Sequence, residues 1–573
     1  MKTLLRVIAC LMVLGLSPVT SIGAADDVML PRSALETVRR IAIQHNGRTK
    51  PLDSFARETL QLITGSPRVG HHDPVETMLF IMADPEHWQQ VPLVSVPFIP
   101  LREALGMDRP QATPVGTPSA HPASGGVPGL GRKTTHISYN DLVATRKLMR
   151  MLPAIVQKQQ REEKLSMLEE ETMDAFQRFG ALSGLLEQKL NLVPPPRASE
   201  RVWSPILEPQ GYPSGMQKEV TDAWNQLLTA VRAGQSGAIN DAAHRLDAAL
   251  TSLNPSDYPP AWRLQLEVSY NHVWPFRVAQ TLYLLAIIGL LLSLSASGSV
   301  IWARLGLGAC VTAFLVHGAG IAMRVILGGR PPVSNFFETT LWLPFVAVAV
   351  ALVFERVYRA RYLALAASIL AAITLVLAEH LPLDSSISPV VAVLHSNLWL
   401  TIHVLTIVAS YGALALATVL AHVYGVLYLR QRHDASLESL GLFLYRVIQV
   451  GVVLLAGGIM LGAVWANASW GRYWGWDPKE TWALITLLWF LAVLHGRFAG
   501  WITGVGVALS TIGGFFLLLM TYYGVSFYLV GLHSYAGGHA KPIPPLLIGY
   551  LMAELAFLAT VGLAALNRRR IAS

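Results

Sequence analysis

One short stretch of this sequence is unusually rich in tryptophan. The segment WANASWGRYWGWDPKETW, residues 465–482, holds five of the chain's 15 tryptophans. Its glycines, Gly471 and Gly475, have no side chain to keep a flat ligand away from the backbone. An interfacial aromatic belt is the plainer interpretation, because Trp favours the lipid headgroup layer. A belt would spread Trp over many helix ends, so this concentration favours a platform for a large π-system.

Four histidines lie where topology could bring them to a ligand. His317 and His495 lie inside long apolar runs, where an ionisable side chain suggests function, although each alone also fits a helix-packing hydrogen bond. His403 and His533 lie at the ends of apolar runs, and we expect both at the level of the tryptophans. Two imidazoles would hold a haem iron six-coordinate. Three other histidines have no such pairing, and we expect surface or packing roles for them: His422, His433 and His539.

The acids beside the tryptophans have a structural explanation. Asp477, Pro478 and Glu480 fit a helix start, with Asp477 as N-cap and Glu480 three residues after it. The segment GGRPPVSNFFETTLW, residues 328–342, ends in the same way, with Ser334 or Asn335 as cap and Glu338 as its partner. Arg330 is then left free, and a free guanidinium beside a haem would suit a propionate.

The elements that must position these residues are membrane helices. Hydrophobic residues make up 53% of the 573-residue chain and charged residues 14%, which excludes an ordinary soluble protein. We predict an all-α polytopic integral membrane protein of about nine transmembrane helices. The expected spans are 278–296, 304–326, 338–355, 362–380, 401–428, 446–466, 481–497, 502–523 and 546–566.

The first half of the chain has ordinary polar composition. Residues 1–25 are typical of a signal peptide, with an uncleaved anchor as the alternative, and either one places residues 26–275 outside the cytoplasm. We expect that region to be mostly helical, with a strand, a turn at Asn46-Gly47, a helix from Asp53 or Ser54, and further helices within 140–192 and 216–253. Its Pro/Gly-rich stretch, residues 108–132, is a predicted flexible linker, and residues 276–570 form the predicted transmembrane domain.

Charge and cysteine content exclude other classes. The formal charge is +8, but the basic residues cluster at span ends, most of them at the connections predicted inside, which fits the positive-inside rule rather than nucleic-acid binding. The two cysteines, Cys10 and Cys310, lie in the leader and in a span. They form neither a disulfide framework nor a CxxC redox pair.

The motif WGRYWGWDPKETWAL resembles the tryptophan-rich WWD signature of haem-handling membrane proteins. Together with GRPPVSNFFET, LTIHVLTIVASYGAL, VLHGR and GLHSYA, in that order, it resembles the cytochrome c synthetase family CcsA, also called ResC. The resemblance covers about residues 275–566. The segment QHNGRTKPLDSFARETL resembles, more weakly, an extension found ahead of some CcsA domains.

The resemblance implies a site and a mechanism. His317 and His495 would be a membrane pair that receives haem b from the inner side, and His403 and His533 an outer pair that ligates it beside Trp470, Trp474, Trp476 and Asp477. Haem would be presented there, on the periplasmic side of the bacterial inner membrane, to the two thiols of an apocytochrome c CxxCH segment. The family's chemistry is mostly positioning. The resemblance also implies that the protein is a haem lyase, that it works with a separate ResB (Ccs1) type membrane protein, and that both are surrounded by membrane lipid.

Three rival functions stay open at the level of sequence. The first is a CcmF-like or CcmC-like protein that loads haem through a covalent haem chaperone. The second is a haem exporter or carrier without synthetase activity. The third is a quinone-linked membrane cytochrome with permanent bis-His haems, which would show redox cycling and stoichiometric haem.

Overall fold

The computed structural model describes residues 30–107, 135–294 except 198 and 255, 300–358, 361–388 except 382, 398–430, 435–533 and 543–572. The described chain divides into two compact units, one up to His272 and one from Val273 onward. The expected leader and the expected linker lie outside the described residues, as do His433 and His539.

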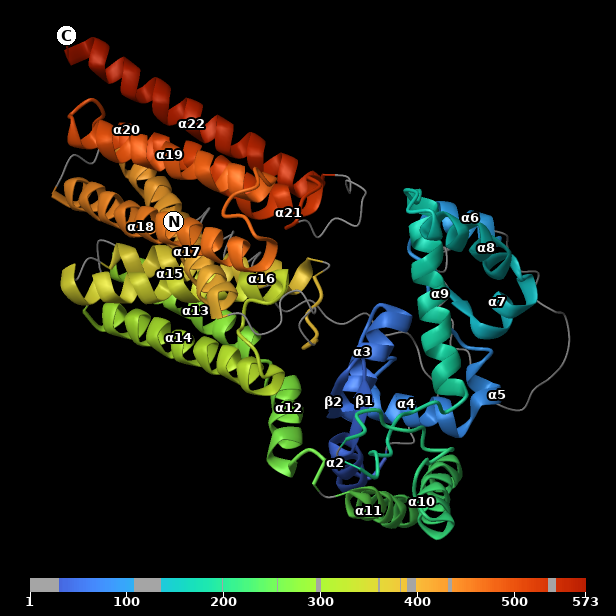
Figure 1. Ribbon diagram of the computed structural model, residues 1–573. Coiled ribbons are helices and arrows are strands. Elements are labelled where there is room, and N and C mark those ends of the chain that lie inside the picture. The colour runs from blue at the N-terminus through green and yellow to red at the C-terminus, as the bar shows by residue number, and fades with distance from the viewer. Residues whose placement is uncertain are drawn as a thin grey trace, which may run out of the picture. The chain divides into compact units, whose positions relative to one another are not determined.

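The second unit is a bundle of long helices that run side by side (Figure 1). Within the described residues, nine of its helices are long and apolar enough to cross a membrane, the eighth being continued by a π-turn and a short helix. They are α13 (Pro275–Ser293), α14 (Val300–Gly328), α15 (Phe336–Tyr358), α16 (Tyr362–His380), α17 (Leu398–Leu429), α18 (Ala435–Trp470), α19 (Pro478–Phe498), α20 (Gly504–Leu519) with η2 (Met520–Gly524) and α21 (Val525–Tyr528), and α22 (Pro545–Ala572).

The nine predicted spans are confirmed as helices, but most of the helices are longer than the spans. The largest difference is at α18, which begins at Ala435 and continues to Trp470. The tryptophan segment is therefore not one loop: Trp465 and Trp470 lie on the last turns of α18, and only residues 471–477 connect to α19. A span predicted from hydropathy ends where polar residues begin. The backbone, however, stays helical until Gly471, which has a φ of +70°, a conformation that glycine adopts readily.

Helices α17 and α18 pack closely because one face of α18 carries glycines. A Cβ on Gly451, Gly458 or Gly462 would lie within 2.9 Å of Leu414, Ile407 or His403, respectively, all on α17. Small residues at such spacing let membrane helices approach backbone to backbone. This contact between the two helices fixes the position of His403 against the C-terminal part of α18.

The first unit is mostly helical, with two short antiparallel sheets, β1–β2 and β3–β4. Its elements are α2 (Arg32–Arg40), β1 (Ala42–His45), β2 (Arg48–Pro51), α3 (Leu52–Thr64), α4 (Pro74–Ala83), α5 (Pro85–Trp88), β3 (Pro92–Ser95), α6 (Ile99–Leu105), β4 (His136–Ser138), α7 (Tyr139–Thr145), α8 (Lys147–Gln160), α9 (Met167–Leu186), α10 (Ser214–Ala233), α11 (Ser236–Leu253) and α12 (Ala261–Val273). A core of its own surrounds the fully buried Trp224.

The start of this unit follows the sequence pattern. Asn46 and Gly47 both have positive φ, 50° and 74°, as a two-residue type I′ hairpin turn requires. The turn joins β1 to β2, and α3 then begins at Leu52. The predicted turn and the helix after it are confirmed.

Candidate functional site

The His403 imidazole lies in the glycine groove of α18. Its Nδ1 is 2.7 Å from the Gly458 carbonyl oxygen, and a Cβ on Gly462 would come within 2.6 Å of its Cε1. A carbonyl oxygen only accepts hydrogen bonds, so Nδ1 carries the proton and donates it. The Nε2 of His403 therefore keeps a lone pair for another partner.

The His533 imidazole is held by the residue that starts α19. Its Nδ1 is 2.9 Å from Asp477 Oδ1, while Asp477 Oδ2 accepts from the backbone N–H of Leu532 at 2.7 Å. Burial opposes ionisation, but the hydrogen bonds from His533 and from the backbone amides lower the pKa of Asp477 below its ordinary value. An ionised carboxylate makes Nδ1 the donor, so Nε2 of His533 also keeps its lone pair.

Asp477 has two structural tasks at once. Its side chain accepts from the backbone N–H of Lys479 and forms a capping box with Glu480, whose carboxylate accepts from the N–H groups of Asp477 and Gly475. The predicted capping roles of both acids are confirmed. The close approach of the His533 segment requires Gly531, since a Cβ there would lie 2.5 Å from Asp477 Oδ2.

Trp465 links the two imidazoles. Its ring lies parallel to that of His403, with centroids 6.3 Å apart and planes at 8°, and 6.2 Å from that of His533. Trp470 contacts both Trp465, at 4.6 Å, and His533, at 6.1 Å. The indole of Trp465 is 4% exposed, and its Nε1 has no hydrogen-bond partner among the described residues.

The other two predicted platform residues form a separate pair. Trp474 and Trp476 contact each other edge to face at 5.7 Å, and no ring contact within the described chain joins either of them to His403 or His533. Trp476 is 71% exposed and has a φ of +57°, which is uncommon for a bulky residue. The structure thus brings His403, His533, Trp465, Trp470 and Asp477 together. Trp474 and Trp476 lie apart from this group, in the connection between α18 and α19.

The structure does not bring His317 and His495 together. His317 is fully buried among the rings of Phe276, Tyr283 and Phe345, and its Nε2 has no partner among the described residues. His495 is exposed and its Nδ1 donates to the Leu491 carbonyl. Helix α14 packs against α13 and α15, whereas α19 packs against α18 and α20. The depth of a residue in a span does not reveal which helices are neighbours.

The expectation that Arg330 is free is wrong. Its Nη1 donates to Glu338 Oε2 at 2.5 Å, its Nε donates to the Ser388 carbonyl, and its side chain is 7% exposed. Glu338 also pairs with Arg324, at 2.9 Å, and its backbone N–H donates to Asn335 as predicted for the cap. Two arginines share one carboxylate, so the cluster carries one net positive charge. Arg324 lies earlier in the chain, inside α14, where no capping pattern reveals it.

His422 has a partner that its sequence neighbours do not reveal. Its Nε2 lies 2.8 Å from Glu554 Oε2 on α22, and its Nδ1 lies 2.8 Å from the Thr418 carbonyl. The ring also stacks on Phe557. The expected packing role fits this contact, which joins α17 to α22.

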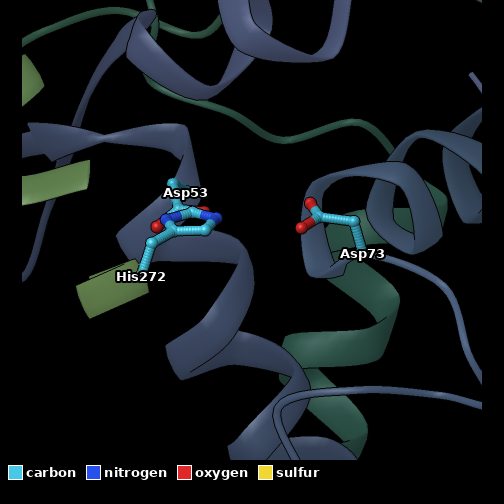
Figure 2. Close-up of side chains that lie close together, drawn as sticks. All are labelled: Asp53, Asp73 and His272. Atoms are coloured by element: carbon cyan, nitrogen blue, oxygen red, sulfur yellow. The ribbon is translucent and has the colours of Figure 1, made fainter. Parts of the chain in front are cut away.

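A second cluster, in the first unit, has the residue types of a metal site. The ligand atoms of Asp53, Asp73 and His272 lie within 4.8 Å of one another, and Figure 2 shows the Asp73 carboxylate pointing toward the other two. Two arginines already occupy the cluster: Arg39 donates to Asp73 at 2.6 Å, and Arg57 donates to Asp53 at 3.0 Å and to His272 at 3.2 Å. It is a charge-balanced ion network and not a cation site.

Sequence reasoning missed the glycines that seat the outer imidazoles. Gly458 and Gly462 form a GxxxG pattern in an apolar run, a known signal for close helix packing. Trp465 was expected only as one of several tryptophans, although its place on a helix puts it next to both histidines. No local signal could have shown that Gly531 lies against Asp477.

The protein is a multi-pass membrane protein. Two of its imidazoles, each hydrogen-bonded through Nδ1, lie beside the indole of Trp465 near the ends of α17, α18, α19 and α21. Residues 333–533, which include every member of this site, match the family model described as cytochrome C assembly protein.

Curated relatives specify the family. The chain is 37% identical over 256 residues to the cytochrome c biogenesis protein CcsA of Guillardia theta, covering 40% of this chain and 82% of that protein. It is 34% identical over 249 residues to CcsA of Prochlorococcus marinus, covering 36% of this chain and 77% of that protein. The chain belongs to the CcsA family of cytochrome c biogenesis proteins.

A further relative extends the match beyond the membrane unit. The chain is 28% identical over 527 residues to Protein NrfI of Wolinella succinogenes. The alignment covers 87% of this chain, more than the residues from Val273 onward could supply, so it includes much of the first unit. This chain spans 54% of the length of NrfI.

Proposed function

We propose that this protein binds haem as a substrate between His403 and His533 and presents it for covalent attachment to apocytochrome c. The single observation that carries the proposal is the hydrogen bond that each imidazole makes through Nδ1. Each donates through Nδ1, to the Gly458 carbonyl or to Asp477, and each therefore keeps the Nε2 lone pair that ligates iron. A hydrogen bond at the second nitrogen is the usual support of a metal-bound histidine.

The residues around the imidazoles fit a flat apolar ligand. Trp465 and Trp470 present indole surface beside both rings, and large aromatic faces stack favourably on an extended π-system. Trp474 and Trp476 supply a second indole pair on the exposed turn, where an incoming polypeptide has access.

The proposed reaction requires no nucleophile from this chain. Each apocytochrome thiol adds across a haem vinyl group: a sulfur–carbon bond forms, the vinyl π-bond is lost, and the thiol proton passes to the other vinyl carbon. Nothing is oxidised and nothing leaves. The histidines hold the substrate, the indoles orient it, and the substrate's own histidine replaces one of the two ligands. Holding the reactants in place supplies the rate.

The partners and the location follow from the same proposal. The apocytochrome CxxCH segment is the second substrate, and a ResB (Ccs1) type membrane protein is the expected partner. The paired histidines and the first unit would lie on the periplasmic side of the bacterial inner membrane, in agreement with the arginines at the opposite helix ends, such as Arg497 and Arg568.

Two further roles are kept as proposals. His317 and His495 would each receive haem from the inner side. They would form two separate binding sites rather than a pair, since α14 packs against α13 and α15, and α19 packs against α18 and α20. Arg330 would bind a propionate in addition to Glu338, and the net positive charge of the arginine cluster supports this.

A maturation assay tests the proposed function. A strain without its own cytochrome c maturation system would express this protein, the expected ResB-type partner and an apocytochrome c. His403→Ala or His533→Ala should abolish covalent holocytochrome, and added imidazole should restore part of it by replacing the missing ligand. His422→Ala, whose imidazole lies in the packing contact with Glu554, is the matched control and should retain maturation. Full activity of both the His403 and His533 variants would refute the proposal, and retained haem without holocytochrome in the wild type would favour a carrier.

A further inference from the structure

The end of the eighth membrane helix departs from α-helical geometry. Met520–Gly524 form a π-turn, in which the N–H of Val525 donates to the carbonyl of Met520, five residues back. A Cβ on Gly524 would lie 2.3 Å from Met520 Sδ, so any larger residue there would displace the Met520 side chain. Such turns are rare, and they occur mostly as single turns at functional sites.

A lysine from the neighbouring helix binds this turn. Lys479 Nζ donates to the Tyr522 carbonyl at 3.2 Å and to Ser526 Oγ at 2.8 Å. Ser526 Oγ in turn donates to the same carbonyl at 2.8 Å. The three groups form a closed hydrogen-bonded set, and a charged donor makes such bonds stronger than neutral ones.

The same helix start also holds the far end of the segment. Two residues before Lys479, Asp477 accepts from the N–H of Leu532 and from Nδ1 of His533. The first turn of α19 therefore binds the chain twice, once at the π-turn and once at the imidazole. A one-residue change of register in the π-turn would rotate everything after it by about 100°, which is enough to carry His533 away from Asp477.

We propose that Lys479 is a positioning residue for His533: its ammonium group locks the π-turn, and the locked turn directs the following chain so that the imidazole meets Asp477. The inference rests on the proposed function insofar as His533 ligates haem. Beyond that function, Lys479 would set the position of the His533 imidazole without touching it.

Neighbouring contacts make a local effect expected rather than unfolding. The Tyr522 hydroxyl bonds Thr339 and Thr340 on α15 at 2.9 and 3.1 Å, and Thr521 bonds Thr486 on α19 at 2.9 Å. None of these contacts involves Lys479. Its replacement therefore removes directly only the hydrogen bonds to the Tyr522 carbonyl and the Ser526 hydroxyl.

The test compares Lys479→Met with Arg472→Met, which removes an exposed cation from the connection just before α19. Full-length proteins are purified with haem, and the fraction of six-coordinate low-spin haem is read from absorption spectra. Lys479→Met should lower haem affinity about tenfold, the lower end of the range for residues that support a ligand. Added imidazole should restore the six-coordinate spectrum, and Arg472→Met should match the wild type.

A double mutant separates positioning from a general structural role. If Lys479 acts through His533, Lys479→Met adds nothing in a His533→Ala background but adds its full effect in a His403→Ala background. Equal additivity in both backgrounds, or a wild-type spectrum for Lys479→Met alone, would overturn the proposal.

Hydrogen exchange without haem gives an independent readout. Amides of residues 520–533 should exchange faster in Lys479→Met than in the wild type or in Arg472→Met, and unchanged exchange contradicts the lock. Should His533→Ala leave the haem spectrum intact, the proposed function fails, while the exchange experiment still decides the role of Lys479 in the turn.

Discussion

Replacing Asp477 with asparagine tests the support of His533 with little change in shape. Asn caps helices about as well as Asp, so α19 should still begin at Pro478. The amide has one acceptor oxygen, whereas the carboxylate now serves Lys479, Leu532 and His533 with two. Lys479 and His533 both bond Oδ1, so an Asn that keeps the cap places its NH₂ group at the Oδ2 position, against the Leu532 N–H. Two donors then face each other, which displaces the segment that carries His533, and the imidazole loses its charged acceptor.

The structure sets the size of the effect. A hydrogen bond to a charged group contributes about 1.5–3 kcal/mol, and each 1.4 kcal/mol corresponds to about tenfold in affinity. We therefore expect Asp477→Asn to weaken haem binding about 10-fold to 100-fold, which is the range for residues that orient metal-bound histidines. The lowered pKa of Asp477 means that the carboxylate is ionised at neutral pH, so the full effect is present there.

Haem titration of purified protein measures this prediction. Glu480→Gln is the matched control, because it removes one negative charge from the same capping box without touching His533. Asp477→Asn should bind weakly and give a five-coordinate spectrum, and Glu480→Gln should bind within about threefold of the wild type, since an exposed or shared charge contributes little. Equal affinity and equal coordination in the two variants would refute the role assigned to Asp477.

Three other predictions follow from the same geometry. Gly462→Ala should displace the His403 imidazole, because the added Cβ would lie 2.6 Å from Cε1 of His403, and the variant should lose six-coordinate haem. Gly457→Ala is the control and should keep it, because a Cβ there would have nothing within 4 Å. Equal haem spectra of the two variants would contradict the seating of His403 against the α18 glycines. Trp474→Ala or Trp476→Ala should reduce retained haem without loss of the protein from the membrane, and unchanged haem content would make these two rings an interfacial belt. Burial, and then the charge of Lys50, lower the pKa of His45 to about 4, so the folded hairpin binds a proton less well than the unfolded chain. The stability of the hairpin should be full above about pH 6.5 and should fall as the pH drops toward 4. Hydrogen exchange of residues 42–51, corrected for intrinsic rates, should show this loss of stability in the wild type and a smaller loss in His45→Gln.

Much of the fold was predictable because a membrane leaves few choices. Backbone groups in lipid must be satisfied within the helix, so long apolar runs fix nine helices and their order. The ends of the helices were less predictable. Apolar content falls at Trp465, but no residue breaks the helix before Gly471, and α18 carries two tryptophans to the histidines as a result.

The site was predictable where one residue has one local task. The capping roles of Asp477 and Asn335 depend on neighbours within three residues and could be read directly. Arg330 depends on a shared carboxylate and a distant carbonyl, and the separation of His317 from His495 depends on helix neighbours. Such contacts join segments far apart in the chain, which spacing along the sequence does not encode.

Electron paramagnetic resonance of the haem-loaded protein, with its histidines labelled with ¹⁵N, tests the central claim most directly. We expect a low-spin ferric signal with hyperfine coupling to two imidazole nitrogens in the wild type. We expect coupling to one imidazole nitrogen in His403→Ala and in His533→Ala. A wild-type signal in the double variant, or coupling that neither substitution changes, would contradict ligation by these two histidines.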